Sequence, residues 1–493
     1  MYHLTWLRYP QAVIFQLPPF KQSGILNYTV SFFNPKTFFM ITNQKEVQVY
    51  RSFAQHNFKQ IPQIIHLTKE QVIDIDVVSH VLPFKTNNYV VNELINWENV
   101  PDDPIFTLTF PRREMLIPEH YDKMRSAMER GATKNELKAV ANEIRHQLNP
   151  HPAGQLEHNV PMIEGQKLTG MQHKYRQTVL FFPSQGQTCH AYCSFCFRWP
   201  QFVGMEEWKF AMRESELMVK YLKQHTEVTD LLFTGGDPMI MKNKIFSGYI
   251  DALLDADIPN LQTIRIGTKA LGYWPYKFVT DDDAEDTLRT FEKIVKSGKN
   301  LAIMAHFNHP VELTTPAVRE AIKRMIATGA QIRTQSPIMR NINADPKIWA
   351  EMWRKQVNLN CIPYYMFLAR DTGAQHYFAV PLVEAWDIFR KSYQMVSGVC
   401  RTVRGPSMSA TPGKIQVLGV SEIAGKKVIA MRMLQGRNPD WIARPFFAEY
   451  DKDAIWLDDL KPAFGEEKFF FEDELAQMFH EELGYESRIH NLE

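Results

Sequence analysis

The sequence lacks an excess of either charge and lacks long apolar runs. Its 56 lysines and arginines nearly balance 55 aspartates and glutamates, which leaves a net charge of +1. A nucleic-acid-binding surface would show as a basic surplus, so we expect no nucleic-acid partner. No apolar run approaches the roughly 18 residues that a membrane-spanning helix needs, so we expect no membrane partner either.

Cysteine is also scarce, with five in 493 residues, three of them in one motif. This usage fits a reducing cytoplasm, and the N-terminal residues MYHLTW lack the charged start and apolar core of a secretory signal. The isolated Cys361 and Cys400 are expected to be buried core thiols, too few for a zinc site. The composition, 45% hydrophobic and 23% charged, is typical of a globular protein of two or three domains.

The other three cysteines, Cys189, Cys193 and Cys196, lie in the run CHAYCSFCFR, directly after an apolar stretch. Three thiolates on one short loop can hold three irons of a 4Fe–4S cluster and leave the fourth iron open. Zinc is less favoured because it normally takes four Cys or His ligands, and His190 is too close to Cys189 to complete the set. A disulfide would leave one thiol over.

The middle of the chain alternates short apolar runs with longer amphipathic stretches. The runs are typical of buried parallel strands, and the stretches at 284–296, 315–328 and 346–358 are typical of helices. This alternation indicates an α/β fold with βαβ units and a parallel sheet. Six units favour a curved, partly closed barrel over an open sheet, although the spacing alone does not decide. The strands are expected at 178–183, 231–234, 263–267, 301–306, 331–335 and 361–368.

Polar residues follow or end each predicted strand. In α/β barrels the chemistry is located at the C-terminal ends of the strands. The cysteine loop follows the first strand, so these polar residues predict an active site at the same edge of the sheet. In strand order they are Gly235, Gly236 and Asp237; Thr268 and Lys269; His306; Gln335; and Arg370 and Asp371.

Outside the barrel the sequence predicts less. The segment 118–148 is charged and nearly free of helix breakers, which predicts helix. The segment 149–177 is rich in Pro, Gly and His and is typical of a covering loop. We expect four parts: an N-terminal α+β extension at 1–110, a helical segment with a covering loop at 111–175, the barrel at 176–415 and a C-terminal extension at 416–493.

Taken together, the motifs resemble the lysine 2,3-aminomutase (KamA-like) family of radical S-adenosylmethionine (SAM) enzymes. The resemblance covers about residues 86–420, and its motifs occur in the order that the family shows. They are NELINWENVPDDPIFTLTFPRREM at 92–115, the cysteine loop, TGGDP at 234–238, IRIGT at 264–268, HFNHP at 306–310, QS at 335–336 and PYY at 363–365. The fold that the resemblance implies is a partial (βα)6 barrel of the TIM type.

The resemblance also implies a radical SAM isomerase. In this family a 4Fe–4S cluster cleaves SAM to a 5′-deoxyadenosyl radical, and pyridoxal 5′-phosphate (PLP) serves the migration of an amino group from Cα to Cβ of a free amino acid. An electron donor such as flavodoxin or ferredoxin would reduce the cluster. The acidic C-terminal tail is either a solvated face or a contact within a homo-oligomer.

The family's functional residues carry over in part. The cluster ligands would be Cys189, Cys193 and Cys196, and the SAM-binding residues would be Gly235, Gly236, Asp237, His306 and Gln335. Glycine lets the backbone approach a ligand closely at the strand end. Arg198 matches the arginine that binds the substrate carboxylate, a role that suits a guanidinium.

The PLP site departs from the family pattern. Lys414, in the glycine-poor run SATPGK, is the candidate lysine for PLP, although a surface lysine in a turn is the other interpretation. The two arginines that hold the PLP phosphate align with Lys174 and Thr178. Lys174 can bind phosphate as a point charge, but Thr178 cannot replace a cation, so Arg176 or Arg404 would have to compensate.

The substrate residues depart as well. The two aspartates that hold the distal ammonium of lysine align, without gaps, with Ala344 and Arg370. An arginine repels an ammonium and suits a carboxylate. Asp345 and Asp371 lie one residue further on, so a local shift of the alignment would restore the acidic pair. The sequence favours a substrate other than L-lysine, for which glutamate is one example.

Two other functions stay open. The protein could keep the cluster and SAM without PLP and abstract hydrogen from another small molecule. It could also be a cluster-binding regulatory protein without catalysis, although the intact cysteine loop argues against that function.

Overall fold

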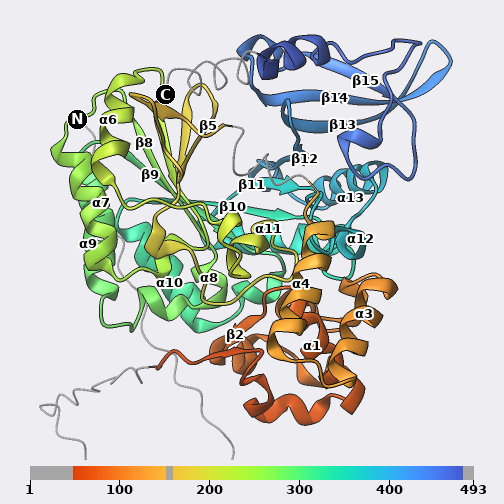
Figure 1. The fold of residues 1–493 in the computed structure, drawn as a ribbon. Coiled ribbons are helices and arrows are strands. Elements are labelled where there is room, and N and C mark those ends of the chain that lie inside the picture. Colours follow the sequence, from red (N-terminus) through yellow and green to blue (C-terminus); the bar gives the residue numbers. More distant parts are fainter. Residues whose placement is uncertain (1–47, 151–158, 481–493) are drawn as a thin grey trace, which may run out of the picture. The chain divides into compact units, whose positions relative to one another are not determined.

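The structure is a computed structural model that describes residues 48–150 and 159–480. The first 47 residues of the predicted N-terminal extension, residues 151–158 of the predicted covering loop and residues 481–493 of the C-terminal extension lie outside the described residues. The described chain is a mixed α/β fold with one large sheet (Figure 1). No helix in it is long and apolar enough to span a membrane.

Seven neighbouring strands of the eleven-stranded sheet are parallel. Six of them confirm the six predicted strands. The seventh, β12, was not predicted because its Gly405-Pro406 step is typical of a turn. The seven are β6 (Thr178–Phe181), β7 (Asp230–Phe233), β8 (Thr263–Thr268), β9 (Asn300–His306), β10 (Gln331–Pro337), β11 (Ile362–Phe367) and β12 (Arg404–Ser409).

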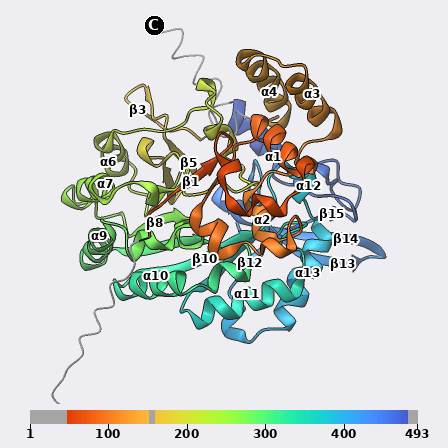
Figure 2. The same ribbon diagram turned by 90° about the horizontal axis from the view of Figure 1, so that it is seen from below.

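Helices connect these strands and lie along their outer side (Figure 2). The predicted helices at 284–296 and 346–358 have the predicted bounds, and the one at 315–328 is shorter by its two capping residues. A continuous apolar core lies between the helices and the sheet. The helices are α6 (Ser215–Gln224), α7 (Asn243–Asp255), the short α8 (Ala270–Tyr273), α9 (Ala284–Lys296), α10 (Pro316–Ala327), α11 (Pro346–Asn358), the short α12 (Gln375–Phe378) and α13 (Leu382–Gln394).

Antiparallel strands extend the sheet at both edges. β5 (Met171–Tyr175) pairs with β6, and β13 (Gly413–Ile423) pairs with β12. β14 (Lys426–Gly436) and β15 (Pro445–Glu449) follow, so the C-terminal extension continues the same sheet. Lys414 is therefore the second residue of β13, an inner strand that pairs with both β12 and β14.

The N-terminal part is mainly helical, and the predicted helix at 118–148 is two helices. Gly131 adopts a left-handed backbone with φ 71°, and Thr133 caps the next helix. A second apolar cluster joins this part to Trp199, Tyr273 and Trp274. Its elements are β1 (Ser52–Ala54), α1 (Lys69–Val81), β2 (Lys85–Asn87), α2 (Pro104–Thr109), α3 (Pro118–Glu129) and α4 (Lys134–Leu148), followed by the small hairpin of β3 (Met162–Ile163) and β4 (Gln166–Lys167).

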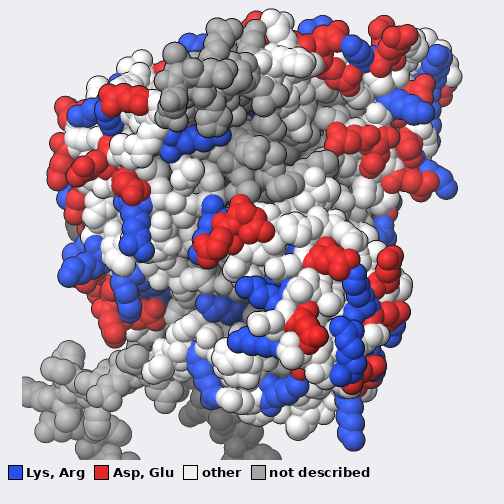
Figure 3. Space-filling model, in the orientation of Figure 1, with Lys and Arg blue, Asp and Glu red and all other residues white. Residues whose placement is uncertain are grey.

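Charges of both signs are interspersed over the face drawn in Figure 3. This pattern accords with the near-zero net charge of the whole sequence.

Candidate active site

The three cysteines of the motif share one loop after β6. All three are free and partly buried, and the backbone N–H of Cys196 donates to the carbonyl of Cys193 over 3.0 Å. Burial raises the pKa of each thiol, that of Cys196 to about 12. Cys193 adds to the rise at both Cys189 and Cys196, and Cys196 adds to the rise at Cys189. The thiols are thus close enough to interact but poorly suited to stay ionised without a cation.

The N-terminal part holds this loop from outside. The backbone N–H of Tyr192 donates to the carbonyl of Lys85 over 2.7 Å, and that of Ser194 donates to Leu108 over 2.9 Å. The Lys85 ammonium donates to the carbonyl of Cys189 over 2.8 Å, and the Tyr50 hydroxyl donates to that of His190 over 2.6 Å. The loop is therefore fixed by residues remote in sequence.

These donors fit an iron–sulfur cluster with one open iron. Thiolates are the usual cluster ligands, and a bound metal deprotonates a thiol. The other two cysteines, Cys361 and Cys400, are 3% and 4% exposed in the core, as predicted. The cluster itself would supply the electron that cleaves SAM.

The glycines after β7 pack directly against the start of the cysteine loop. A Cβ on Gly236 would lie 2.5 Å from the backbone nitrogen and oxygen of Thr188, the residue before Cys189. Gly235 has φ 142°, and a Cβ there would lie 2.3 Å from the Gln187 side chain. Only glycine allows this close approach of the end of β7 to the cysteine loop.

The Asp237 carboxylate joins the ends of β7 and β8. It accepts from the Thr268 hydroxyl and the Lys269 backbone N–H, each over 2.8 Å, and from the Met239 backbone N–H over 2.9 Å. Burial raises its pKa to about 6. The carboxylate is thus occupied within the protein, and its part in SAM binding stays a prediction.

His306 and Gln335 meet at the ends of β9 and β10. The Gln335 amide nitrogen lies 2.7 Å from Nε2 of His306. Beside them the Lys269 ammonium pairs with the buried Glu312 and lies 4.2 Å from the centre of the Tyr273 ring, whose hydroxyl lies 3.4 Å from the Cys193 sulfur. A polar layer therefore connects the predicted SAM residues with the cysteine loop.

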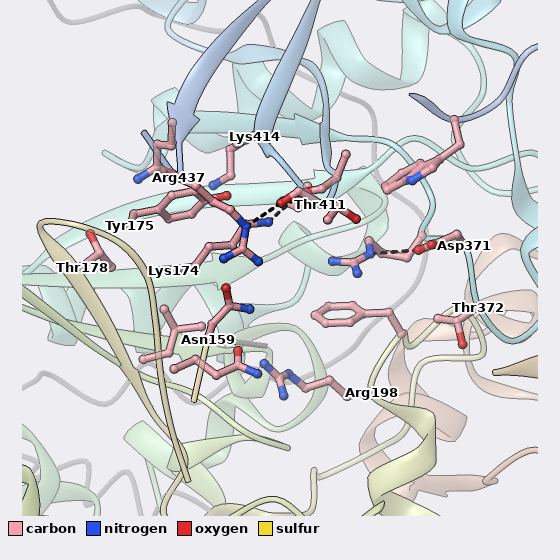
Figure 4. Close-up of a pocket in the computed structure, with 18 of the residues that line it drawn as sticks. Asn159, Lys174, Tyr175, Thr178, Arg198, Asp371, Thr372, Thr411, Lys414 and Arg437 are labelled. Atoms are coloured by element: carbon pink, nitrogen blue, oxygen red, sulfur yellow. Dashed lines mark hydrogen bonds and ion pairs between the residues drawn. The ribbon is translucent and has the colours of Figure 1, made fainter. Parts of the chain in front are cut away.

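A cavity of about 520 Å³ lies next to the cysteine loop, against Phe197 and Arg198 (Figure 4). Figure 4 shows Lys414 and Arg437 reaching it on one side and Arg198 on another. Six basic and two acidic side chains line it, so its electrostatic character favours anions. The basic residues are Lys174, Arg198, Arg265, Arg370, Lys414 and Arg437, and the acidic residues are Asp371 and Asp458.

Lys414 lines the cavity and does not lie in an exposed turn. Its ammonium lies 4.4 Å from the centre of the Tyr365 ring and 5.5 Å from that of Phe367. Burial, followed by the charges of Arg265 and Arg404, lowers the pKa of Lys414 to about 7. A lysine with such a pKa has a neutral, nucleophilic amine near neutral pH, as attachment of PLP requires.

The cavity also holds cations that could bind the PLP phosphate. Lys174 donates to the carbonyl of Ala410 over 2.6 Å, and burial followed by neighbouring cations, Arg437 first, lowers its pKa. Arg437 donates to the carbonyl of Thr411 over 3.0 Å. Thr178, the other aligned position, lines the cavity but carries no charge.

Neither sequence candidate for the missing phosphate cation lines this cavity. Arg176 is exposed, and Arg404 lies over the rings of Tyr364 and Tyr365, near Lys414 but outside the lining. Arg437, which the sequence did not single out, takes a position beside Lys174 instead. The donor set fits PLP, since a lysine and two cations face one cavity, and the buried Oδ1 of Asn159 has no hydrogen-bond partner among the described residues.

Two arginines flank the ring of Phe197. The guanidinium carbon of Arg198 lies 5.3 Å from the ring centre, and that of Arg370 lies 5.2 Å away. Burial, partly offset by Cys196 and reinforced by Arg370, lowers the pKa of Arg198 to about 10. Asp371 lines the cavity beside Arg370, at 3.4 Å, whereas Asp345 caps α11 by accepting from the Lys347 N–H. The shifted acidic pair is thus not assembled in the cavity.

Comparison with known proteins places this site in context. No family model matches the chain. It is 29% identical over 396 residues, 80% of this chain and 92% of the relative, to an Aquifex aeolicus protein assigned as an L-lysine 2,3-aminomutase. It is 26% identical to the L-lysine 2,3-aminomutase of Haemophilus influenzae, over 49% of this chain and 67% of that protein.

A third relative is the glutamate 2,3-aminomutase of Clostridioides difficile, at 24% identity over 43% of this chain and 47% of that protein. Among solved structures, Streptococcus suis SuiB bound to the precursor peptide SuiA matches at 12% identity, over 53% of this chain and 52% of that one. Its TM-score is 0.32, too low to support any argument. Lysine 2,3-aminomutases use a 4Fe–4S cluster, SAM and PLP. The chain is thus a distant relative of the lysine 2,3-aminomutase family of radical SAM enzymes.

Proposed function

We propose that the protein is a SAM- and PLP-dependent 2,3-aminomutase whose substrate is a free amino acid with a second carboxylate. The observation that carries the proposal is the cavity between the cysteine loop and Lys414, with its surplus of buried cations. Substrate, PLP and the adenosyl group would meet there. A glutamate 2,3-aminomutase among the relatives supports the substrate class.

Each cation has a proposed role. Arg198, two residues after Cys196, binds the substrate α-carboxylate. Arg370, which also lies against the Phe197 ring, binds the distal carboxylate. Lys174 and Arg437 hold the PLP phosphate, and Lys414 anchors the cofactor. A lysine substrate would bring another ammonium among these cations, which repel it.

The remaining residues position the cofactors. Gly235 and Gly236 let the strand end approach SAM, with His306 and Gln335 beside it, and Asp237 braces that edge. PLP when bound supplies the stabilised radical through which nitrogen migrates. The protein's own contribution is to orient the substrate β-carbon toward the adenosyl group and to exclude water from the cavity.

The proposal also covers the barrel, the domains, the place in the cell and the electron donor. The parallel strands curve into a partial barrel, and the domain division is the one predicted from the sequence except at 415/416, where β13 crosses the predicted boundary. The enzyme works in the cytoplasm with an electron donor such as flavodoxin or ferredoxin.

Product analysis tests the function. Anaerobically reconstituted protein would be incubated with SAM, PLP, dithionite and either L-glutamate or L-lysine. β-Amino acids, separated by chromatography from the isomeric substrates, and 5′-deoxyadenosine would be measured by mass spectrometry. We expect a β-amino acid from a dicarboxylic substrate and little from lysine. Preference for lysine contradicts the substrate class, PLP-independent turnover contradicts the PLP role, and absence of SAM cleavage contradicts catalysis.

A further inference from the structure

We infer that His173, His225 and Glu227 form a zinc-binding site at the β5 edge of the sheet, separate from the cysteine loop. One ligand atom from each of the three side chains lies within 4.8 Å of the other two. The proposal does not depend on the aminomutase function, because it rests on these three residues alone.

The fold brings the three residues together from two elements. Gln172 and Lys174 line the cavity, so strand alternation directs His173, between them, to the opposite face of β5. There it meets α6, whose Tyr221 hydroxyl lies 2.7 Å from Nδ1 of His173. His225 and Glu227 follow the end of that helix. Packing of α6 on β5 thus assembles the set.

The hydrogen bonding of His173 prepares one nitrogen for a metal. Nε2 lies 3.1 Å from the carbonyl of Arg176, so Nε2 carries the proton and donates it. Metal-binding histidines commonly donate their second N–H to a backbone carbonyl, which fixes the tautomer. Nδ1 is then left as an acceptor, now used by the Tyr221 hydroxyl. A metal ion would displace that hydroxyl.

The other two ligands, His225 and Glu227, contact each other. Nδ1 of His225 lies 2.9 Å from a carboxylate oxygen of Glu227. The His225 ring stacks on Tyr221, at 4.0 Å between centres, and stands at 87° to the His173 ring, 5.8 Å away. The side chains of His225 and Glu227 are 35% and 33% exposed, which leaves an ion a path from solvent.

The donor set selects the ion. Two imidazoles and one carboxylate are a known three-ligand set for zinc, with a fourth tetrahedral position for water. Such a site binds Zn²⁺ more tightly than Fe²⁺. Zinc would link the end of α6 to β5, the strand that places Lys174 at the cavity.

Metal analysis of tag-free, anaerobically reconstituted full-length protein tests the site. After dialysis against a weak chelator, zinc chloride would be titrated in competition with a chromophoric chelator, and zinc, iron and protein would be counted. We expect one zinc per chain and a higher melting temperature with zinc. His225→Ala and Glu227→Gln should each weaken zinc binding at least about tenfold, while His56→Ala, at an exposed histidine, should not.

A second variant separates this site from the cysteine loop. The full-length Cys189→Ala/Cys193→Ala/Cys196→Ala variant should keep its zinc. Circular dichroism without zinc controls for folding, and Glu227→Gln at a partly exposed position is the milder of the two ligand variants. Loss of zinc from the cysteine variant, retention of zinc by both ligand variants, or no tight zinc in the wild type would each overturn the proposal.

Discussion

The Gln335 amide nitrogen lies 2.7 Å from Nε2 of His306, and the two residues are register partners on β10 and β9. Because an amide N–H donates, Nε2 accepts, and the ring carries its proton on Nδ1. Burial, reinforced by the charge of Lys269, lowers the pKa of His306 to about 3. The imidazole is therefore neutral near neutral pH.

Replacing Gln335 with glutamate should make His306 titrate at a pH where the wild-type imidazole stays neutral. A carboxylate beside Nε2 favours the imidazolium and raises the pKa of His306. Below that pKa the pair is neutral overall, and above it the glutamate leaves a net negative charge. SAM is proposed to bind beside this pair and carries a carboxylate, so its affinity should then fall as pH rises.

Equilibrium dialysis with SAM over a range of pH would measure this change. Gln331→Glu is the matched control, since Gln331 lies on the same strand but is exposed at its start. The control and the wild type should have the same profile. A Gln335→Glu profile indistinguishable from theirs would contradict the assigned proton position.

Gly236→Ala should deplete the cluster. The new Cβ would lie 2.5 Å from backbone atoms of Thr188, which cannot move without displacing Cys189. Iron and sulfide per chain after reconstitution should fall by more than about half, with a loss of stability of the order that overpacking causes, about 1–3 kcal/mol.

Gly248→Ala provides the comparison for that substitution. Gly248 lies inside α7, and apart from the adjoining backbone of α7 itself no atom of the described residues lies within 4 Å of its added Cβ. Since alanine favours helix over glycine, this variant should keep its cluster and gain about 0.5–1 kcal/mol of stability. Equal iron content in the two variants would mean that the glycine contact does not position the loop.

The sequence predicted those parts of the site that depend on local pattern. Apolar runs followed by polar residues located six strand ends, because parallel strands place their C-terminal ends at one edge. It could not show that the Asp237 carboxylate is already occupied by Thr268 and Lys269, since that depends on how two strand ends pack.

Arg437 illustrates the same limit at longer range. It follows β14, whose antiparallel register sets Gly436 opposite Gly413 and Gln435 opposite Lys414. Only that pairing brings Arg437 to Lys174, and no spacing rule in the sequence predicts it. Arg176, adjacent in sequence to the expected phosphate residues, was the more natural candidate and is exposed.

Arg370→Ala should impair use of a dicarboxylic substrate. Loss of a charge-assisted hydrogen bond costs about 1.5–3 kcal/mol, which corresponds to a rise in KM of about 10- to 150-fold. SAM cleavage without substrate should change little. Steady-state kinetics with the best substrate would measure both, with Arg340→Ala as the control because Arg340 pairs with Glu384 outside the cavity. Unchanged KM in the Arg370 variant would remove this arginine from the substrate site.

The rate at which PLP attaches to Lys414 should depend on pH with a midpoint unusually low for a lysine. The amine reacts only when neutral, and its pKa of about 7 means that the neutral fraction rises through neutral pH rather than above pH 10. The initial rate of PLP attachment should therefore increase with pH and reach half its maximum near pH 7. The new visible absorption would be recorded after subtraction of the cluster spectrum, and Lys414→Ala should show none.

Arg404→Ala tests whether the charge of Arg404 helps to lower the pKa of Lys414. The Arg404 charge lowers the pKa of Lys414, so its removal should raise the pKa and move the midpoint of attachment to higher pH. Lys391→Ala, at an exposed lysine paired with Asp387, should leave the midpoint in place. A wild-type midpoint near the pKa of an ordinary lysine would show that the cavity does not lower the pKa of Lys414. A midpoint that moves to lower pH in Arg404→Ala would show that the Arg404 charge is not a cause of the shift.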